Sequence, residues 1–492
     1  MTYAIHLIVV GLYLLVLLFV GARKARGVQS QADFSLAGRA LSTPVMVGTL
    51  LATWIGTGSI FGNAEEAYGV GVAAFILPVS GALGIVALFF LAGRIRRTEH
   101  FTIQDILEER FGAPARLVGT AALLAAYVII VSYQYRAGAA VLTRLAPELD
   151  ASLAVILVAI FVIVYTALAG MLSVAYTDLA NGVVMAVGLA LALPVLVAKA
   201  GGGRAVLAAL EPAQRDIWGH YSLVELVSVL LPTLLLILGD ANMYTRFFSA
   251  RDPRVARRSA LGMLAGVICL ELVIVACALV GRALHPGLVN PGHVIVHLAF
   301  ESLPPVLGAF LVAAVLAVVV STADSYLLSP ATSLVRDVYQ RFLNPAATDA
   351  AVVRASRCLV VVLGLVALGL AFASDAFFRV ALFAYTLYGA AITPALLAAL
   401  LWPRATPAAA TASMVTGLVG ALLWRWLISG RVLTAWARGS GRDGLADWAE
   451  RVASADAVIP AAFASVAVLV LVSWARPNPR ADLEVAAVPT SS

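Results

Sequence analysis

The feature that most constrains this chain is its series of long apolar segments. Thirteen can be delimited, at residues 5–20, 45–69, 71–93, 117–143, 151–169, 175–198, 223–245, 259–281, 305–329, 355–373, 377–401, 408–428 and 456–474. Because about 20 apolar residues in a helix cross a bilayer, each segment can span the membrane once. The continuous runs exclude a membrane β-barrel, whose strands alternate in polarity. The sequence therefore predicts an all-α membrane protein with about 13 transmembrane helices.

The composition agrees with a single polytopic membrane domain over residues 1–492. Hydrophobic residues make up 62% of the chain and charged residues 12%, whereas about a quarter of the residues in soluble domains are charged. Cys269, Cys277 and Cys358 all lie in apolar segments, so neither a disulfide framework nor a zinc site is predicted. The net charge of +6 is attributed to the loops of a membrane protein rather than to nucleic-acid binding.

Basic residues predict the orientation of the spans. The first segment is followed, not preceded, by three basic residues, which is the reverse of a cleaved signal peptide. With the N-terminus outside, the inner loops hold 21 Lys and Arg residues and the outer loops 11, of which five lie between residues 425 and 451. Since positive loops stay inside, we expect the N-terminus outside, the C-terminus inside, the 251–258 loop inside and the 429–455 loop outside.

The order of the segments indicates an internal repeat. Residues 45–198 and 221–401 each contain five spans, and an odd number places the second group in the membrane in the opposite sense. Such inverted repeats mark many secondary transporters, whose sites lie at interrupted helices near the midplane. An extra N-terminal helix at 4–21 and two C-terminal helices at 408–474 flank this 5+5 core. Two glycines and three hydroxyls within residues 53–59 predict an interruption in the second span.

An acidic residue in the ninth span carries the strongest functional signal. Ser321, Asp324 and Ser325 share one face of a helix, and Thr322 lies beside them. Their oxygen atoms suit a hard cation such as Na⁺. The hydroxyls alone could bond the preceding turn, but an ionisable residue inside the bilayer is costly and usually functional. We therefore predict a site for a hard cation in this span.

Several separated motifs resemble those of the sodium:solute symporter family, over about residues 4–475. They occur in family order at residues 34–39, 52–62, 93–96, 101–112, 165–170, 176–178, 321–325 and 337–339. The resemblance implies an inverted-repeat fold of the leucine-transporter type and Na⁺-coupled import of a small organic solute by alternating access. It implies a multi-pass protein of the plasma (inner) membrane whose partners are Na⁺, the solute and lipid. No cofactor, transition metal, nucleic acid or obligatory protein partner is expected.

The resemblance further implies where sodium binds. The first site would use the carbonyl oxygens of Ala52, Ile55 and Val318 and the hydroxyl oxygens of Ser321 and Thr322. Some members have a second sodium site, whose matching positions are Asp178, Ser321, Asp324 and Ser325. Asp324 stands where that version of the site has a hydroxyl. Proton coupling through Asp178 and Asp324 is the alternative.

The solute is expected among the broken helix and the third, sixth and tenth core helices. Candidate residues are Trp54, Thr57, Tyr133, Gln134, Arg136, Asp240, Tyr244, Tyr385 and Tyr388. Arg136 favours a carboxylate-bearing, acidic or zwitterionic solute, because a buried guanidinium needs an acid or an anionic ligand. A structural pair with Asp240 is the alternative for Arg136. Residues 56–68 also resemble choline-transporting members, and aromatic side chains around Trp54 could hold a quaternary ammonium.

Other functions fit the sequence less well. The chain lacks H-E-x-x-H, G-x-S-x-G and P-loop motifs, so enzymatic activity is not expected. A re-entrant filter segment, which would indicate a channel, is not visible either. His293 and His297 have the i, i+4 spacing of a metal pair but no third ligand nearby, and are interpreted as interfacial histidines. Glu65 and Glu66 are expected to face the outer vestibule.

Overall fold

Helices make up nearly all of the described chain. The computed structural model describes residues 2–25, 30–218, 221–373, 377–428, 432–439 and 455–476, with Gly444, Leu445, Ala449 and Val452. Within these residues the β-structure is limited to a bridge between Leu41 and Ala250. The all-α prediction is therefore confirmed. The predicted outer loop at 429–455 lies mostly outside the described residues.

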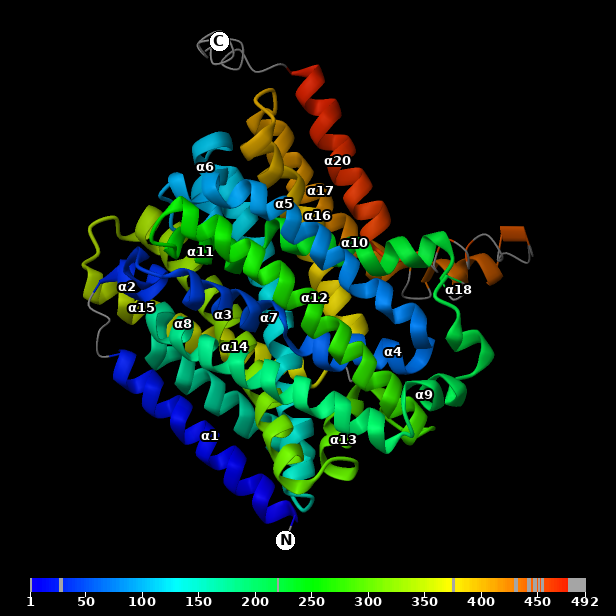
Figure 1. Ribbon diagram of the computed structural model, residues 1–492. Coiled ribbons are helices and arrows are strands. Elements are labelled where there is room, and N and C mark those ends of the chain that lie inside the picture. Colours follow the sequence, from blue (N-terminus) through cyan, green and yellow to red (C-terminus); the bar gives the residue numbers. More distant parts are fainter. Residues whose placement is uncertain are drawn as a thin grey trace, which may run out of the picture. The chain divides into compact units, whose positions relative to one another are not determined.

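The helices follow one another along the chain as coloured in Figure 1. The α-helices are α1 (Thr2–Ala25), α2 (Gln31–Leu36), α3 (Thr43–Trp54), α4 (Ala64–Val70), α5 (Leu77–Arg97), α6 (Ile103–Phe111), α7 (Ala113–Leu145), α8 (Ala151–Lys199), α9 (Gly203–Ala209), α10 (Leu223–Gly239), α11 (Ala241–Ser249), α12 (Pro253–Leu284), α13 (Val294–Glu301), α14 (Pro305–Leu334), α15 (Asp349–Ala371), α16 (Phe377–Leu401), α17 (Pro407–Leu423), α18 (Val432–Gly439) and α20 (Val458–Ala475). The 3-10 turns are η1 (Ala37–Arg39), η3 (Gly71–Ile76), η4 (Pro212–Arg215) and η5 (Pro291–His293), and the π-helical turns are η2 (Gly58–Asn63), η6 (Val335–Leu343) and η7 (Trp424–Ile428).

Twelve helical segments of the described chain are long and apolar enough to cross a membrane. The difference from the predicted 13 arises at residues 45–69, which do not form one continuous helix. The structure divides them into α3, of 12 residues, and a second part that begins with η2. The predicted inner loop at 251–258 also differs, because α12 already begins at Pro253. Asp252 caps that end by accepting the N–H groups of Arg254 and Val255.

The chain forms two compact units. The first comprises residues 1–101, 127–221 and 242–381, and α14 is at its centre. Every residue of α14 from 311 to 333 is buried, and the helix packs against α1, α3, α8 and α15. Its alanine, valine and leucine residues cover all sides, which is typical of a helix that is surrounded by others. α12 packs against α3 and α5 in the same unit. The residues of α14 that were predicted to bind an ion thus lie inside the helical core.

The two predicted spans at 151–169 and 175–198 are joined more tightly than expected. They form the single element α8, which departs from helical geometry at Gly170, with φ 69° and ψ 170°. A side chain at this position would be strained, and its Cβ would lie 2.8 Å from the ring of Phe34. Phe34 belongs to one of the family-like motifs. That motif therefore packs against the junction that leads into the second half of α8.

The second unit comprises residues 102–126, 222–241 and 382–492. In the described part of this unit, α17 and α20 lie side by side at the end of the colour series in Figure 1. Small residues permit this approach, and the hydroxyls of Ser413 and Ser465 meet at 2.9 Å between them. Gly417 packs directly against the backbone of α16, where a Cβ would come within 2.1 Å of the Ala390 carbonyl oxygen.

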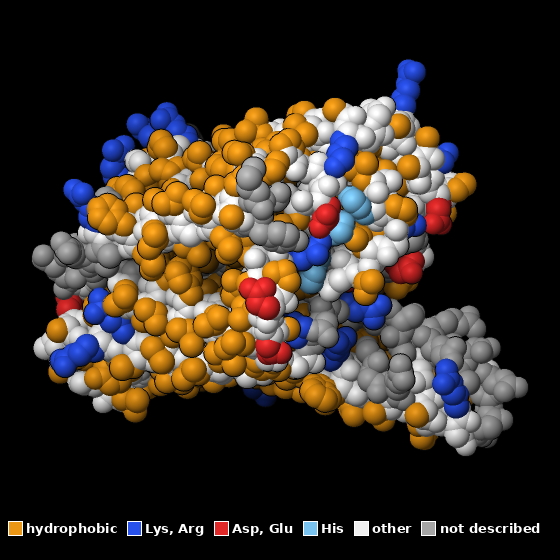
Figure 2. Space-filling view, turned by 90° about the horizontal axis from the view of Figure 1, so that it is seen from below, with side chains coloured by type: hydrophobic (Ala, Val, Ile, Leu, Met, Phe, Trp, Pro, Cys, Tyr) orange, Lys and Arg blue, Asp and Glu red, His pale blue; other side chains and the backbone are white. Residues whose placement is uncertain are grey.

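Large apolar side chains lie on the surface of the protein. On α1, Leu12, Leu15 and Phe19 are 59%, 64% and 66% exposed. Figure 2 shows one face on which hydrophobic side chains predominate. Exposed apolar surface of this extent would be unfavourable in water but is the expected covering of helices in lipid.

Candidate functional site

The second predicted span is broken at its glycine-rich and hydroxyl-rich segment, as predicted. α3 ends at Trp54, and Ile55 leaves the helical conformation with φ −73° and ψ 85°. In an unbroken helix the carbonyl of Ala52 would accept the N–H of residue 56. Here the hydroxyl of Ser321 lies 3.3 Å and that of Thr322 3.4 Å from the Ala52 oxygen. The break therefore directs a backbone carbonyl toward α14.

The residues predicted for the first sodium site lie at or next to this contact. Ile55 is 0% exposed and Val318 is 1% exposed. The carbonyl of Val318 points along α14 toward Ser321 and Thr322, which follow it by about one helical turn. A Cβ on Gly56 would come within 3.0 Å of the Thr322 side chain, so the broken segment and α14 are in close contact. Buried backbone carbonyls and hydroxyls that lie close together are a donor set suited to a hard cation.

A buried arginine lies among the residues that match the second sodium site. Arg246 on α11 is fully buried, and its Nη2 lies 3.2 Å from Asp178 Oδ2 and 2.7 Å from Ser325 Oγ. Its Nε donates to Thr49 Oγ1 at 3.0 Å. Asp178 also accepts the hydroxyls of Thr49 and Ser321. Ser321 therefore connects the first site directly to the carboxylate that holds Arg246.

Asp324 lies beside this pair but is less well bonded. It is fully buried, and Ser325 Oγ lies 3.4 Å from its Oδ1. Its Oδ2 has no hydrogen-bond partner among the described residues. A buried carboxylate in this situation is strongly destabilised unless a cation or a proton compensates its charge.

Arg246 was not among the residues predicted from the sequence. The predicted span ended at residue 245, which placed Arg246 with the basic residues of an inner loop. In the structure α11 continues to Ser249 and directs Arg246 inward. The signal that could have found it is the pair of predicted intramembrane acids, Asp178 and Asp324, for which a buried cation is the expected counterpart.

A second buried charged residue, an acid, was also missed. Glu271 on α12 is 3% exposed and accepts hydrogen bonds from Ser59 Oγ at 2.5 Å and Asn63 Nδ2 at 2.9 Å. Ser59 and Asn63 belong to η2, directly after the break. Glu271 therefore ties the second part of the broken helix to α12. An acidic residue in the middle of an apolar segment was the available signal.

Six of the predicted solute-binding residues belong to the first unit: Trp54, Thr57, Tyr133, Gln134, Arg136 and Tyr244. The hydroxyl of Thr57 at the break donates to Gln134 Oε1 on α7, and both residues are fully buried. Trp54 lies against α5, where a Cβ on Gly81 would be 3.3 Å from its indole. Tyr244 is fully buried on α11 beside Phe248. Thr57 and Gln134 therefore join the break to α7.

Arg136 lies on another face of α7. It follows Gln134 by two residues, which places the two side chains about 200° apart around the helix. Arg136 Nη1 donates to the Ala371 carbonyl at 2.8 Å. The residue also lines a pocket of about 160 Å³, together with Asn290, His293 and Phe377. The structure thus separates the arginine from the Thr57–Gln134 contact.

The remaining three candidates, Asp240, Tyr385 and Tyr388, belong to the second unit. The predicted span at 223–245 is itself broken, because α10 ends at Gly239 and Asp240 is extended, with φ −60° and ψ 113°. The hydroxyl of Tyr388 donates to the Gly239 carbonyl at 2.8 Å and accepts the N–H of Ala241 at 3.1 Å. Tyr388 therefore satisfies the backbone groups that this break exposes.

The histidines do not form the metal pair that their spacing suggested. His293 ends η5, whereas His297 lies within α13. His297 packs edge-on against His285, with ring centroids 4.5 Å apart, and its Nδ1 lies 2.9 Å from Arg144. Burial, followed by the charges of Arg144 and Arg136, lowers the pKa of His293 to about 4. Among the described residues there is no group of three or more His, Cys, Asp or Glu placed to hold a metal ion.

Glu65 and Glu66, which are adjacent in α4, have different surroundings. Glu66 accepts a hydrogen bond from Tyr221 at 2.9 Å. Glu65 lies near η5, where a Cβ on Gly292 would be 3.4 Å from its Oε2. Their predicted exposure to an outer vestibule stays a prediction.

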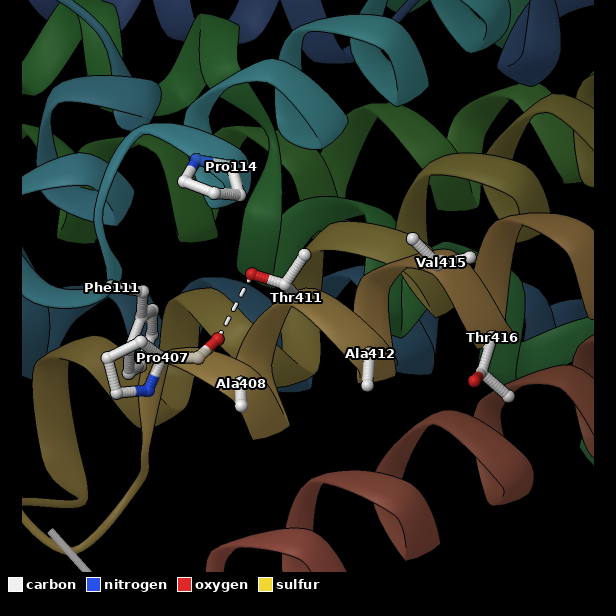
Figure 3. A pocket seen from close by; sticks show the side chains of 8 residues that line it. All are labelled: Phe111, Pro114, Pro407, Ala408, Thr411, Ala412, Val415 and Thr416. Atoms are coloured by element: carbon white, nitrogen blue, oxygen red, sulfur yellow. Dashed lines mark hydrogen bonds between the residues drawn. The ribbon is translucent and has the colours of Figure 1, made fainter.

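A larger pocket, of about 610 Å³, lies in the second unit between the α6–α7 junction and α17 (Figure 3). Its lining consists of Phe111, Pro114, Pro407, Ala408, Thr411, Ala412, Val415 and Thr416. The hydroxyl of Thr411 donates to the Pro407 carbonyl at 3.0 Å, one turn earlier in the same helix. The lining includes no charged residue. This pocket therefore offers no counter-charge to a carboxylate or a cation.

Known proteins agree with the fold. A sodium/proline symporter of Staphylococcus aureus is 26% identical over 438 residues, which cover 85% of each chain. A high-affinity proline transporter of Bacillus subtilis is 26% identical over 429 residues, covering 83% of this chain and 89% of its own. A Na⁺-coupled sialic acid symporter, solved in a substrate-bound outward-open state, matches with a TM-score of 0.80 at 16% identity, over 96% of this chain and 98% of its own.

These findings confirm the predicted resemblance and the fold of the leucine-transporter type. They identify a multi-pass integral protein of the plasma membrane, and the relatives are transporters rather than enzymes. The orientation of the termini and the repeat boundaries at 45–198 and 221–401 stay predictions. The model of the sodium:solute symporter family matches residues 34–417, a range that covers most of the chain and includes both the broken helix and α14. The chain therefore belongs to the sodium:solute symporter family.

Proposed function

We propose that the chain imports a small carboxylate-bearing solute, acidic or zwitterionic, together with Na⁺. The observation that carries the proposal is the convergence of the Ala52 carbonyl with the hydroxyls of Ser321 and Thr322 at a helix break. Ile55 and Val318 contribute further carbonyl oxygens. Irregular backbone is tolerated inside a membrane protein where its exposed carbonyls have a partner, and a cation is such a partner.

Sodium binding would couple transport to movement through this contact. The ion would join the end of α3 to the middle of α14, at the place where the hydroxyls of Ser321 and Thr322 lie 3.3 and 3.4 Å from the Ala52 oxygen. With Na⁺ bound, the broken segment is fixed and the Thr57–Gln134 contact beside it is held in place. When Na⁺ leaves, the oxygens repel one another and the two helices separate more easily. The ion thereby favours one conformation over another, which is the thermodynamic requirement for coupling.

Arg136 is proposed to recognise the carboxylate of the solute. The guanidinium is planar and can bind a carboxylate with two parallel hydrogen bonds. The pocket that it lines also contains Asn290 and Thr143 as polar groups. Proline, the solute named for the relatives, is a zwitterion with such a carboxylate. Proline is therefore the first solute to test.

The test is uptake of radiolabelled proline into proteoliposomes with an imposed Na⁺ gradient. We expect accumulation with Na⁺ and none with K⁺. Ser321→Ala combined with Thr322→Ala should raise the Na⁺ concentration for half-maximal uptake at least about tenfold, which corresponds to about 1.4 kcal/mol. Thr411→Ala is the matched control, because that hydroxyl bonds the carbonyl one turn earlier in α17. It should leave the Na⁺ dependence unchanged.

Three results would contradict the proposal. An unchanged Na⁺ dependence in the folded double variant would remove Ser321 and Thr322 from the site. Uptake driven by a pH gradient without Na⁺ would favour proton coupling. If choline is taken up, but proline, proline analogues and other carboxylates are not, the result would favour the quaternary ammonium alternative.

A further inference from the structure

We infer that the end of α5 and the start of α12 together bind the headgroup of an anionic phospholipid. α5 ends at Arg97 and α12 begins at Pro253. The two ends are in contact, since a Cβ on Gly93 would lie 3.3 Å from Cδ of Arg257 and 3.8 Å from the carbonyl oxygen of Pro253. Five exposed arginines that form no ion pair in the described part of the chain lie at these ends: Arg94, Arg97, Arg254, Arg257 and Arg258.

The acidic residues at these ends leave the five arginines unbalanced. Glu99 lies 3.9 Å from Arg96, and Asp252 lies 3.6 Å from Arg251. Each acid is therefore next to a further arginine. The five remaining guanidinium groups repel one another, and an anion between them would relieve the repulsion. A phosphate group suits this place, because a planar guanidinium can donate two parallel hydrogen bonds to its oxygen atoms.

An exposed apolar stripe continues from the arginines along α5. Its members are Phe90, Val86, Leu83 and Val79. Residues 79, 83, 86, 90, 94 and 97 recur at intervals of three or four, so the stripe and the two arginines of α5 lie on one face of the helix. From residue 79 to residue 90 the stripe extends about 16 Å, about half of the hydrocarbon core of a bilayer. Its length therefore matches one acyl chain in one leaflet.

α12 has a matching stripe. Its exposed members are Leu261, Ala265, Ile268 and Leu272. Residues 254, 258, 261, 265, 268 and 272 again recur at intervals of three or four, so these apolar residues share a face with Arg254 and Arg258. The stripe from residue 261 to residue 272 also extends about 16 Å. Each helix therefore presents arginines at one end and apolar side chains over the depth of one leaflet.

The two helices are antiparallel neighbours. The guanidinium of Arg257 lies 4.8 Å from the ring centroid of Phe89, near the end of α5. At the opposite ends, Tyr68, shortly before α5, donates to the carbonyl of His285, which follows α12. The seam between α5 and α12 therefore runs along both helices.

Both stripes lie on the same side of this seam. Measured in the direction of increasing residue number, the α5 stripe and its arginines are rotated by about 60 to 140° from Phe89, which faces α12. The α12 stripe and its arginines are rotated by about 20 to 100° from Arg257, which faces α5. Because the helices are antiparallel, rotation in the same sense along each chain leads to the same side of the seam. The arginines and the apolar residues of both helices thus form one continuous surface.

An anionic phospholipid has the chemistry that this surface fits. Its phosphate would lie among the arginines, and its two acyl chains would lie along the two stripes. The positive-inside rule accounts for arginines at this end of each helix, but not for their convergence on one side of one seam. Basic residues between transmembrane helices at the membrane surface are suited to anionic headgroups. A free phosphate would leave the apolar stripes unused, and a neutral lipid would leave the arginines unbalanced.

The experiment measures lipid binding by native mass spectrometry of the full-length protein in detergent. Phosphatidylglycerol, which carries one negative charge, is compared with phosphatidylcholine that has the same acyl chains. We expect phosphatidylglycerol to bind at least about tenfold more tightly, because each nearby arginine strengthens the attraction to an anionic headgroup. Arg97→Gln combined with Arg258→Gln removes one arginine from each helix. This variant should bind phosphatidylglycerol at least about tenfold more weakly and phosphatidylcholine as before.

The matched control removes two other exposed arginines. Arg354→Gln combined with Arg404→Gln gives the same net charge, and both positions are exposed and predicted to lie inside. This variant should bind phosphatidylglycerol like the unmodified protein. Inorganic phosphate and glycerol phosphate, added at the concentration of the lipid, should not displace it, since neither has acyl chains.

Three outcomes would overturn the inference. Equal binding of the two lipids by the unmodified protein would do so without any variant. An equal loss of phosphatidylglycerol binding in both double variants would show that binding follows net charge rather than this seam. Displacement of the lipid by inorganic phosphate would identify a site for a free anion instead.

Discussion

At the scale of the residue, recognition of a carboxylate depends on the shape of the Arg136 side chain as well as on its charge. Arg136→Lys keeps the positive charge but replaces the planar fork with a single ammonium group. We expect the solute concentration for half-maximal uptake to rise at least about tenfold, or about 1.4 kcal/mol. Na⁺ binding measured without solute should stay the same, because Arg136 lies on a different face of α7 from Gln134, the residue that meets the break.

A second arginine on α7 provides the control for this prediction. Arg144 lies two turns after Arg136, and its side chain is 41% exposed and pairs with Glu301 at 3.5 Å. Arg144→Lys should leave the solute dependence unchanged. Equal affinity for the solute in Arg136→Lys and the unmodified protein would exclude a bidentate contact. The esters of a transported solute give an independent measurement, since a carboxylate contact requires that they fail as substrates.

The sequence predicted some residues of the candidate site but not others. Ser321 and Thr322 were found because three hydroxyls and an acid within five positions of an apolar helix are an unusual local pattern. Arg246 was not, because a single arginine at the end of an apolar segment is more often an interfacial residue. Its burial depends on the direction in which α11 continues after Asp240, and its bond to Asp178 joins residues 68 positions apart. No local pattern encodes such a contact.

At the scale of the element, the sequence predicts one of the two helix breaks much more clearly than the other. In the second span two glycines and three hydroxyls lie within seven positions, and the break was predicted there. The break at Asp240 follows a single glycine, Gly239, and was not predicted. Its backbone groups are satisfied by Tyr388, which lies 149 positions away from Gly239. A helix break whose backbone groups are satisfied by a residue far away in the sequence does not require a recognisable pattern among its neighbouring residues.

The break in the second span can be tested by adding one methyl group. A Cβ at Gly56 would come within 3.0 Å of both Oγ1 and Cγ2 of Thr322. Gly56 is not among the residues with positive φ, so alanine fits its backbone and the effect comes from the contact. We expect Gly56→Ala to displace the Thr322 hydroxyl and to raise the Na⁺ concentration for half-maximal uptake several-fold.

Gly69 in α4 is the matched control, because a Cβ there meets no other atom within 4 Å. Gly69→Ala should leave the Na⁺ dependence unchanged. Thermal unfolding in KCl distinguishes a local effect from general destabilisation, since Na⁺ is then absent from both variants. A normal Na⁺ dependence for folded Gly56→Ala would show that Thr322 does not contribute its hydroxyl.

At the scale of the whole molecule, the apolar segments were sufficient to predict the helical membrane fold. Whether an apolar helix can lie in lipid depends on its own composition and length, so a membrane span can be predicted from the residues of that segment alone. The interruption of residues 45–69 by a non-helical segment reduced the number of continuous spans in the described chain to 12. Helix packing, such as that of α14 against α8, depends on residues that are far apart. The orientation in the membrane follows from charge alone and is open to experiment.

The orientation can be tested on α12, whose two ends are predicted to lie on opposite sides. Its 32 residues extend for about 48 Å, which exceeds the hydrocarbon core of about 30 Å. Four arginines lie between residues 251 and 258 at its start, and these should remain inside. Arg254 is exposed at this end, and Val289, just beyond the other end, is 103% exposed. Both positions are therefore accessible to a reagent.

Single cysteines at these positions give opposite expected results in intact cells. After replacement of Cys269, Cys277 and Cys358, Val289→Cys should react with an impermeant thiol reagent applied from outside. Arg254→Cys should react only after the membrane is permeabilised, because the arginine-rich segment is expected on the cytoplasmic side. Labelling of Arg254→Cys but not of Val289→Cys in intact cells would invert the predicted topology. Because the second predicted repeat contains α12, that result would also invert the predicted orientation of this repeat in the membrane.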